Sequence, residues 1–480
     1  MTFATVMLAK VALMLCASFG LFLAFLLARD RVAGRRIDVG LALLALLALF
    51  TYSHFGRFHQ PRGYVHGWEM FNYYFPTKYA DELGYDGLYG AALAADAERA
   101  TPYFSGVETV RDLRTNRLVP AETLRRDPSF RARFSADRWQ AFKRDLAYLQ
   151  PNYDARGWLG PLQDRGYNAP PPRTALTAPI VRALGPLDSG SIHTLALLDV
   201  LLLASLLLGI QRTFGLRAAC VAAILFGTSS LGSFAWIGGS FLRLDWLALL
   251  GLGICALASR RHGVAGVLFG AAIMLRVFPV LFAFGVLARG AILAWQTRSL
   301  PREHAAFAGS LAATCAVLGL ASLALAGGTD AWVAWFGKIT QHTETVFANH
   351  MGLAAFLWQP WTLGPAALAL AALVIASLSR ADDTQAALLG GVLVYAFGLI
   401  AGYYYIYLML YALWRFPPRW DVRSWLLVTA LFLPSAVEIA IRAAEMRITP
   451  RYVAASIVLL LAWALLFEQV WRAPESVPEG

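Results

Sequence analysis

The sequence contains few cysteines, and their positions argue against two common ways of stabilising a protein. Only four occur in 480 residues, and none lies in a polar region. Their spacing matches neither a zinc site nor a disulfide framework. Charged residues are also scarce, at 15% of the chain, whereas 58% of the residues are hydrophobic. A soluble domain cannot bury that much apolar surface, so the composition predicts a protein of the lipid bilayer. The four cysteines lie within apolar runs, at Cys16, Cys220, Cys255 and Cys315.

Several motifs of well-known enzyme classes are missing from the sequence. It has no GxxxxGK[ST] phosphate loop, no GxSxG and no HExxH, so ATP hydrolysis and serine-esterase chemistry lack support. The glycine pattern around Gly266 and Gly270 is typical of helix packing. The net charge of +11 comes mainly from arginines at the ends of apolar runs, and no contiguous basic patch indicates a nucleic-acid partner.

Apolar runs of about 20 residues dominate the chain and predict an all-α polytopic membrane protein with about 13 transmembrane helices. The first run, Thr5 to Ala28, is too long for the apolar core of a signal peptide, so we expect a retained helix. The predicted helices lie near 5–28, 37–55, 190–210, 217–237, 241–258, 262–275, 277–297, 304–326, 361–379, 384–400, 401–414, 422–441 and 451–471.

The turns between these runs predict the orientation of the chain. Arginine-bearing turns are expected in the cytoplasm, which places the N-terminus and the large polar insert outside and the C-terminus inside a cell (inner) membrane. The sequence thus divides into two N-terminal helices (1–53), an extracytoplasmic loop domain that is mixed and partly helical (54–172), and a transmembrane bundle (173–480) with a second outer loop at 327–350.

The insert has one clear helical pattern. Ser135 is a suitable N-cap for an amphipathic helix that runs to Gln150. Near the end of the insert, Pro170 to Pro172 should stay extended, and the apolar segment Thr174 to Leu184 is expected to lie along the membrane. The apolar face of the amphipathic helix consists of Trp139, Phe142, Leu146 and Leu149.

The stretch from His66 to Tyr89 is a candidate for chemistry, because it places an acid among aromatic side chains just after the second predicted helix. Glu69 is well sited there to act on a group held at the lipid surface. The alternative is that Glu69 is a solvated loop carboxylate.

Two arginines near predicted helix ends are further candidates, because charges in membrane segments are costly and often functional. Arg276 lies between two short apolar runs, where a broken hairpin is tolerated only if it lines a cavity within the protein. A guanidinium there could clamp a phosphate. The alternatives are a cytoplasmic-edge arginine at Arg276 and a structural ion pair between Arg243 and Asp245.

The second outer loop carries polar side chains that suit sugar hydroxyls or a diphosphate. Its two histidines do not form a convincing zinc site without further ligands. The residues are Lys338, His342, Glu344, Asn349 and His350.

The chain resembles the polytopic C-type (GT-C) glycosyltransferases, and within them a mannosyl- and arabinofuranosyl-transferase-like group often labelled as a domain of unknown function. Three loose motifs in the right order carry the resemblance. They are Glu69 with Phe71, Tyr73 and Gly84-Tyr85-Asp86-Gly87-Leu88-Tyr89; Tyr167-Asn168-Ala169-Pro170-Pro171 with Pro186-Leu187; and Ala265 to Gly270 followed by Arg276-Val277-Phe278-Pro279.

The resemblance implies transfer of a mannose or pentose-like sugar from a polyprenyl-phosphate donor to an acceptor hydroxyl, with inversion, on the outer face. Glu69 would be the general base, where the family usually has Asp. Arg276, with Arg243 as a second candidate, would bind the donor phosphate. Some family members use a divalent cation and others do not, and the sequence leaves this open, as it does the acceptor (glycan, lipid or protein). The implied sugar and acceptor pocket comprises Trp68, Tyr73, Tyr74, Asp86, Asp245, Asn349 and His350.

Two other functions remain open from the sequence. A transporter or flippase of a lipid-linked saccharide would share the basic residues, and we would expect charged pairs deeper in its helices and repeated halves. A non-catalytic membrane scaffold would use the insert to bind a partner and would tolerate replacement of Glu69 and Arg276.

Overall fold

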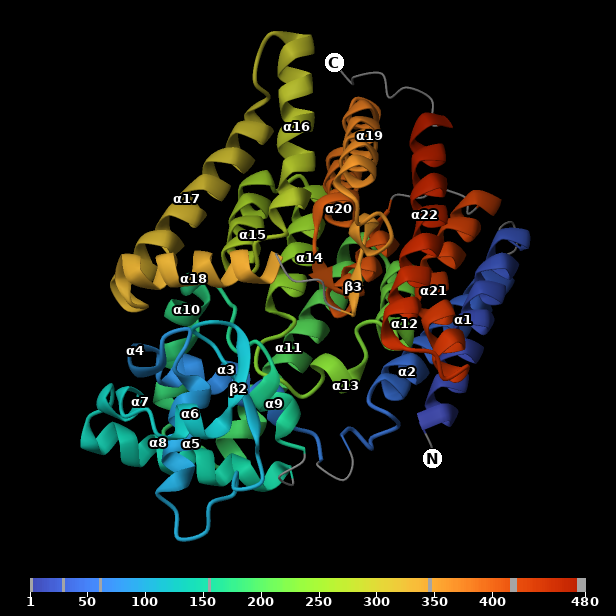
Figure 1. Ribbon diagram of the computed structural model, residues 1–480. Coiled ribbons are helices and arrows are strands. Elements are labelled where there is room, and N and C mark those ends of the chain that lie inside the picture. Colours follow the sequence, from blue (N-terminus) through green and yellow to red (C-terminus); the bar gives the residue numbers. More distant parts are fainter. Residues whose placement is uncertain are drawn as a thin grey trace.

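The computed structural model describes residues 3–27, 31–59, 63–153, 157–343, 348–414 and 421–472. These residues form helices almost throughout, with two short two-stranded sheets. Figure 1 shows a bundle of long helices with a lobe of shorter elements at one end. Together with the composition, this makes the chain an all-α membrane protein.

Seven helices of the described residues are long and apolar enough to cross a membrane. Many of their side chains face outward, as expected for helices that contact lipid rather than a protein core. These helices are α1 (Phe3–Leu26), α11 (Ser189–Phe214), α16 (Val280–Thr297), α17 (Arg302–Leu325), α19 (Pro360–Leu378), α21 (Val422–Ala443) and α22 (Ile448–Arg472).

Shorter helices fill the interior of the bundle. Four of them are apolar but only 13 to 15 residues long. Each range predicted as a membrane helix overlaps a helix of the structure, but the helix near 217–237 ends at Thr228 and the one near 401–414 is a 3₁₀ helix. The number of helices that cross the bilayer stays a prediction. The shorter elements are α12 (Leu216–Thr228), α14 (Asp245–Ala258), α15 (His262–Leu275), α20 (Asp383–Phe397) and the 3₁₀ helix η3 (Gly402–Leu413). Helix α2 (Arg31–Tyr52) has 22 residues and packs against α12 and α1.

The lobe has its own core of aromatic side chains, including Phe71, Phe75, Phe142 and Trp158. Its elements are α3 (Gly67–Lys78), α4 (Ala80–Leu83), α5 (Leu88–Ala97), β1 (Thr109–Asp112) paired antiparallel with β2 (Arg117–Pro120), α6 (Ala121–Arg125), α7 (Ser129–Ala132), α8 (Ala136–Leu149), η1 (Gln150–Asn152), α9 (Leu159–Gln163) and α10 (Pro171–Ala183).

The amphipathic helix predicted after Ser135 is confirmed as α8. The Ser135 hydroxyl accepts a hydrogen bond from the backbone N–H of Arg138 at 3.4 Å, which caps the helix. The predicted apolar face is fully buried in the lobe, so it packs on protein rather than on the bilayer.

The prediction for the triple proline was wrong in part. Pro170 is extended, but Pro171 and Pro172 form the first turn of α10. Proline is tolerated there because first-turn N–H groups have no helical acceptor, and its fixed φ suits a helix. The apolar segment after the prolines belongs to the same helix, which packs against α3, α15, α17 and α18 between lobe and bundle.

The second outer segment was predicted as a loop, and most of it is helical. Helix α18 (Gly328–Thr343) lies beside the bundle and above the lobe in Figure 1. Further on, β3 (His350–Met351) pairs antiparallel with β4 (Ile400–Ala401). The remaining short elements are α13 (Phe234–Ile237) and η2 (Leu353–Ala355).

Helices α15 and α17 approach closely at two glycines, as the glycine pattern predicted. A Cβ atom at Gly266 would lie 2.0 Å from the Ser310 hydroxyl and 2.3 Å from the Phe307 carbonyl oxygen. One at Gly270 would lie 2.9 Å from Thr314. Only glycine therefore allows this contact, which supports α15 up to its end beside Arg276.

We expect Gly266→Val to destabilise the protein, because a valine would force α15 and α17 apart at a cost of about 1–3 kcal/mol. The matched control is Gly263→Val on the same helix, where a Cβ meets no atom within 4 Å. The measurement is thermal unfolding of both variants in detergent. Equal melting temperatures for the two variants would contradict the predicted contact.

Candidate functional site

Glu69 lies in the first turn of α3, where His66 fixes the start of the helix. The His66 Nδ1 accepts a hydrogen bond from the Glu69 backbone N–H at 3.4 Å, and its Nε2 lies 3.0 Å from the carbonyl oxygen of Ala235 in the bundle. Burial lowers the pKa of His66 to about 3, so the ring is neutral and Nδ1 is free to accept. A neutral histidine thus connects the helix that carries Glu69 to the bundle.

The Glu69 carboxylate is not a solvated loop group. Its side chain is 14% exposed, and Oε2 lies 3.0 Å from Nε of Arg243, whose side chain is 3% exposed. Burial raises the pKa of the Glu69 carboxyl above its ordinary value of 4.5, and the charge of Arg243 opposes that rise. The pair therefore joins an acidic residue of the lobe to a basic residue of the bundle.

Arg243 is held by its backbone as well as by its side chain. The Asp199 carboxylate on α11 accepts hydrogen bonds from the backbone N–H groups of Arg243 and Leu244, at 2.9 and 3.0 Å. The guanidinium lies 4.6 Å from the ring centroid of Tyr73 and 5.2 Å from that of Tyr403. Asp199 therefore positions the loop before α14, and the tyrosines enclose the charge.

The ion pair considered between Arg243 and Asp245 is not formed. Asp245 instead faces Arg173, with Oδ2 and Nε 3.6 Å apart, and its Oδ1 accepts a hydrogen bond from the Trp246 backbone at 2.7 Å. Residues two apart in a turn point in different directions, so each finds its partner on another element.

Arg276 occupies the break between α15 and α16, as the two short apolar runs predicted. The backbone of Arg276 is extended, and the next helix begins at Val280. Its guanidinium lies 5.6 Å from the Tyr73 ring centroid, so it belongs to the same site rather than to the opposite edge of the bundle. The side chain is buried, and its Nη1 donates to the Leu275 carbonyl oxygen at 3.3 Å.

Arg173 is a third arginine of the site that sequence reasoning missed. It lies in the first turn of α10, is fully buried, and donates to the Phe241 carbonyl oxygen at 2.8 Å. Its guanidinium lies 5.0 Å from the Tyr73 ring centroid. The available signal was an arginine directly after the prolines, at the start of a segment rich in apolar residues.

The three guanidiniums surround the ring of Tyr73, whose hydroxyl donates to Asn168 at 2.8 Å. We call Arg173, Arg243 and Arg276 the arginine cluster. Five of its buried nitrogens have no hydrogen-bond partner within the described part of the chain. Unpaired buried donors of this kind are costly unless an anion completes them, and arginine forks match phosphate oxygens well.

Two predicted pocket residues face other parts of the lobe. The Trp68 indole donates to Asp164 at 2.8 Å. The Tyr74 hydroxyl donates to Asp145 at 3.1 Å, and the same carboxylate oxygen lies 2.7 Å from the ammonium of Lys78. Trp68 is adjacent to Glu69 in the chain and borders the site, whereas Tyr74 belongs to a buried network that holds the lobe together.

Asn349 and His350 lie near the segment that carries Tyr403, the tyrosine that packs against the Arg243 guanidinium. The Asn349 carbonyl oxygen accepts a hydrogen bond from Gly402 at 2.7 Å, next to Tyr403 in the chain. His350 is buried in β3.

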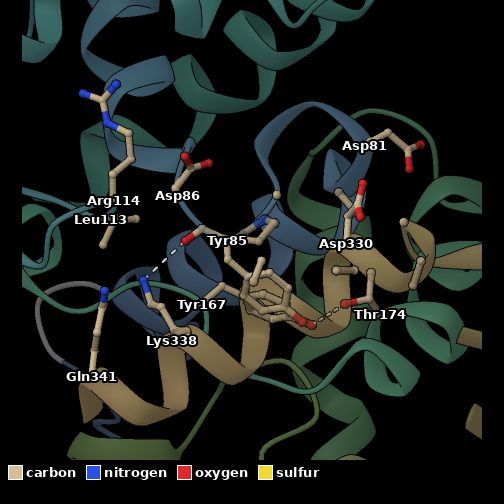
Figure 2. Close-up of a pocket in the computed structure, with 18 residues that line it drawn as sticks. Asp81, Tyr85, Asp86, Leu113, Arg114, Tyr167, Thr174, Asp330, Lys338 and Gln341 are labelled. Atoms are coloured by element: carbon tan, nitrogen blue, oxygen red, sulfur yellow. Dashed lines mark hydrogen bonds between the residues drawn. The ribbon is translucent and has the colours of Figure 1, made fainter. Parts of the chain in front are cut away.

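A cavity of about 540 Å³ lies between the lobe and α18 (Figure 2). Tyr85 and Tyr167 stack in it with centroids 5.7 Å apart, and Tyr167 in turn contacts Tyr73 at 5.5 Å. Asp86 lines the cavity and pairs with Arg133 at 2.7 Å, so it lies apart from Glu69.

Metal ligands do not gather at this site in the described residues, where no group of three or more His, Cys, Asp or Glu side chains could hold a metal ion. Glu344, which was considered with the second outer loop, lies outside the described residues.

Comparisons with protein-family models, with curated proteins and with solved structures give no match for this chain.

Proposed function

We propose that the protein is a membrane glycosyltransferase. It would move a hexose or pentose, such as mannose, from a polyprenyl-phosphate donor to an acceptor hydroxyl on a glycan, lipid or protein. The observation that carries this proposal is the contact between a buried carboxylate, Glu69, and an arginine cluster in which five nitrogens have no hydrogen-bond partner among the described residues. An acid beside an anion site is what displacement of a phosphate by a hydroxyl requires.

The arginine cluster fits the donor phosphate. Its three charges lie within 6 Å of one tyrosine ring, at 4.6, 5.0 and 5.6 Å, so several could contact one phosphate group. As the sugar–phosphate bond breaks, the electron pair of that bond passes to the phosphate oxygen. Fixed guanidiniums would stabilise the developing charge without the reorganisation that water needs.

Glu69 fits the general base. In the structure its carboxylate is engaged by Arg243. A bound phosphate would compete for that guanidinium and leave the carboxylate free to accept the proton of an acceptor hydroxyl. The acceptor oxygen then bonds to the anomeric carbon as the phosphate departs, and a single in-line displacement inverts the configuration of that carbon.

The membrane context supports a lipid-linked donor. The site lies where α3 and α10 of the lobe meet the segment before α14 and the break after α15, at the lobe end of the bundle. In this proposal about 13 helices cross the cell (inner) membrane, the lobe lies on the extracytoplasmic side, and the donor reaches the cluster from the outer leaflet.

A transporter of lipid-linked saccharides remains a second candidate because of one observation within the helices. Lys10 of α1 and Glu438 of α21 are fully buried. The Lys10 ammonium donates to the Ser229 carbonyl oxygen at 2.7 Å, and Glu438 accepts from Arg442 at 2.8 Å. Charged pairs deep in the helices, together with repeated halves, were the features expected of a transporter.

We expect Glu69→Gln to reduce sugar transfer by about 10² to 10⁴-fold, because glutamine keeps the shape but cannot take a proton. The assay is transfer from polyprenyl-phosphate sugars to a membrane extract, with protein folding checked in parallel. The control is Glu108→Gln, which changes an exposed glutamate of the lobe. Equal product from Glu69→Gln and the wild type would exclude Glu69 as the base. Product from neither, with lipid-linked sugar moved across vesicles, would favour the transporter.

Transfer should fall as the pH is lowered through the pKa of Glu69. A base must be ionised, and burial raises the pKa of this carboxyl, so the loss should occur above pH 4.5, where an exposed glutamate would still be ionised. The measurement is kcat/KM against pH. A rate that stays constant down to pH 4.5 would contradict the assignment.

A further inference from the structure

The cavity beside α18 has the features of a small-molecule site. Its volume of about 540 Å³ lies within the range of roughly 300–1,000 Å³ that is typical of such sites. Lobe and bundle elements both contribute to its walls. On the α18 side, small residues leave the space open: Ala331, Ala334 and Gly337.

The floor of the cavity is an aromatic platform of Tyr85 and Tyr167. Their hydroxyls are anchored, because Tyr85 donates to the Ala169 carbonyl oxygen at 2.8 Å and Tyr167 shares a hydrogen bond of 2.8 Å with Thr174. Figure 2 shows the two rings lying against each other in the middle of the cavity. Aromatic faces of this kind pack against the C–H faces of sugar rings.

The polar groups of the cavity favour an uncharged ligand rich in hydroxyls. The Lys338 ammonium is buried and donates to the Tyr85 carbonyl oxygen at 3.3 Å. Burial lowers the pKa of Lys338 to about 8. The other basic residue of the lining, Arg114, is already paired with Asp112 and Asp127, at 3.1 and 3.0 Å. Three carboxylates also line the cavity and disfavour an anion. These are Asp81, Asp86 and Asp330.

The cavity adjoins the arginine cluster. Tyr167 contacts Tyr73, around which the cluster gathers, and Thr174 follows Arg173 directly in α10. A ligand on the tyrosine platform would therefore lie beside the proposed donor phosphate.

We propose that this cavity binds the acceptor, and that the acceptor is a neutral saccharide whose ring packs on Tyr85 and Tyr167. This inference rests on the proposed function. The same sugar could be the end of a soluble glycan or the headgroup of a glycolipid. Helix α18 exposes Val333 and Phe336, at 71% and 58%, so a glycolipid could also reach the cavity along this apolar surface.

The test variant is Gly337→Phe, which fills the cavity without disturbing the fold. A Cβ at Gly337 meets no atom within 4 Å, and the residue lines the cavity. The control is Gly309→Phe on α17, an exposed position where a Cβ also meets no atom within 4 Å. We expect Gly337→Phe to lower transfer about 100-fold, because the acceptor is displaced, while binding of polyprenyl phosphate is unchanged. Transfer by Gly337→Phe at the rate of Gly309→Phe would overturn the proposal.

A binding experiment separates this proposal from the proposed function. Saturation-transfer NMR is recorded on the Glu69→Gln protein in nanodiscs, with methyl mannoside, methyl arabinofuranoside, mannobiose and galacturonate, and with mannosyl-diacylglycerol in the bilayer. We expect contacts with a neutral probe that Gly337→Phe abolishes, and none with galacturonate. That result stands even if no sugar transfer is detected.

The probes also identify the source of the acceptor. Contacts with the soluble sugars indicate a glycan, and contacts with the glycolipid alone indicate a lipid acceptor. Absence of contact with every neutral probe, or contacts that persist in Gly337→Phe, would overturn the proposal.

Discussion

The contact between Glu69 and Arg243 is the interaction on which the site depends, because it places a carboxylate of the lobe against a guanidinium of the bundle at 3.0 Å. Removing two charges from water is costly, and a buried pair often gives back little net stability. The cost is greater here because Arg173 and Arg276 bring further unpaired donors to the same tyrosine. Such an arrangement is better explained by a ligand that completes it than by a role in folding.

The fold supports this site from both sides. Helix α10 enters between lobe and bundle with Arg173 in its first turn, and the break after α15 presents Arg276. Asp199 holds the backbone of the loop that carries Arg243. These elements come from distant parts of the sequence, yet all three arginines surround Tyr73. The lobe thus supplies the acid and the bundle most of the positive charge, with the cavity beside α18 next to both.

Much of the fold could be predicted from the sequence because its signals are local. Apolar runs located the helices of the bundle, and the spacing from Trp139 to Leu149 located α8. Glu69 and Arg276 stood out because charges near membrane helices are rare. The partners could not be predicted in the same way. Arg243 pairs with Glu69 rather than Asp245, and Arg173 enters the site on a helix that begins at prolines, because tertiary packing decides both.

The most direct test of the account is a cryo-EM structure of the protein in a nanodisc with a long-chain polyprenyl phosphate. The account predicts that the phosphate lies within hydrogen-bond distance of the arginine cluster, with Arg243 turned from Glu69 toward the phosphate oxygens. Phosphate density at another place, with no phosphate bound to the arginine cluster, would contradict the account.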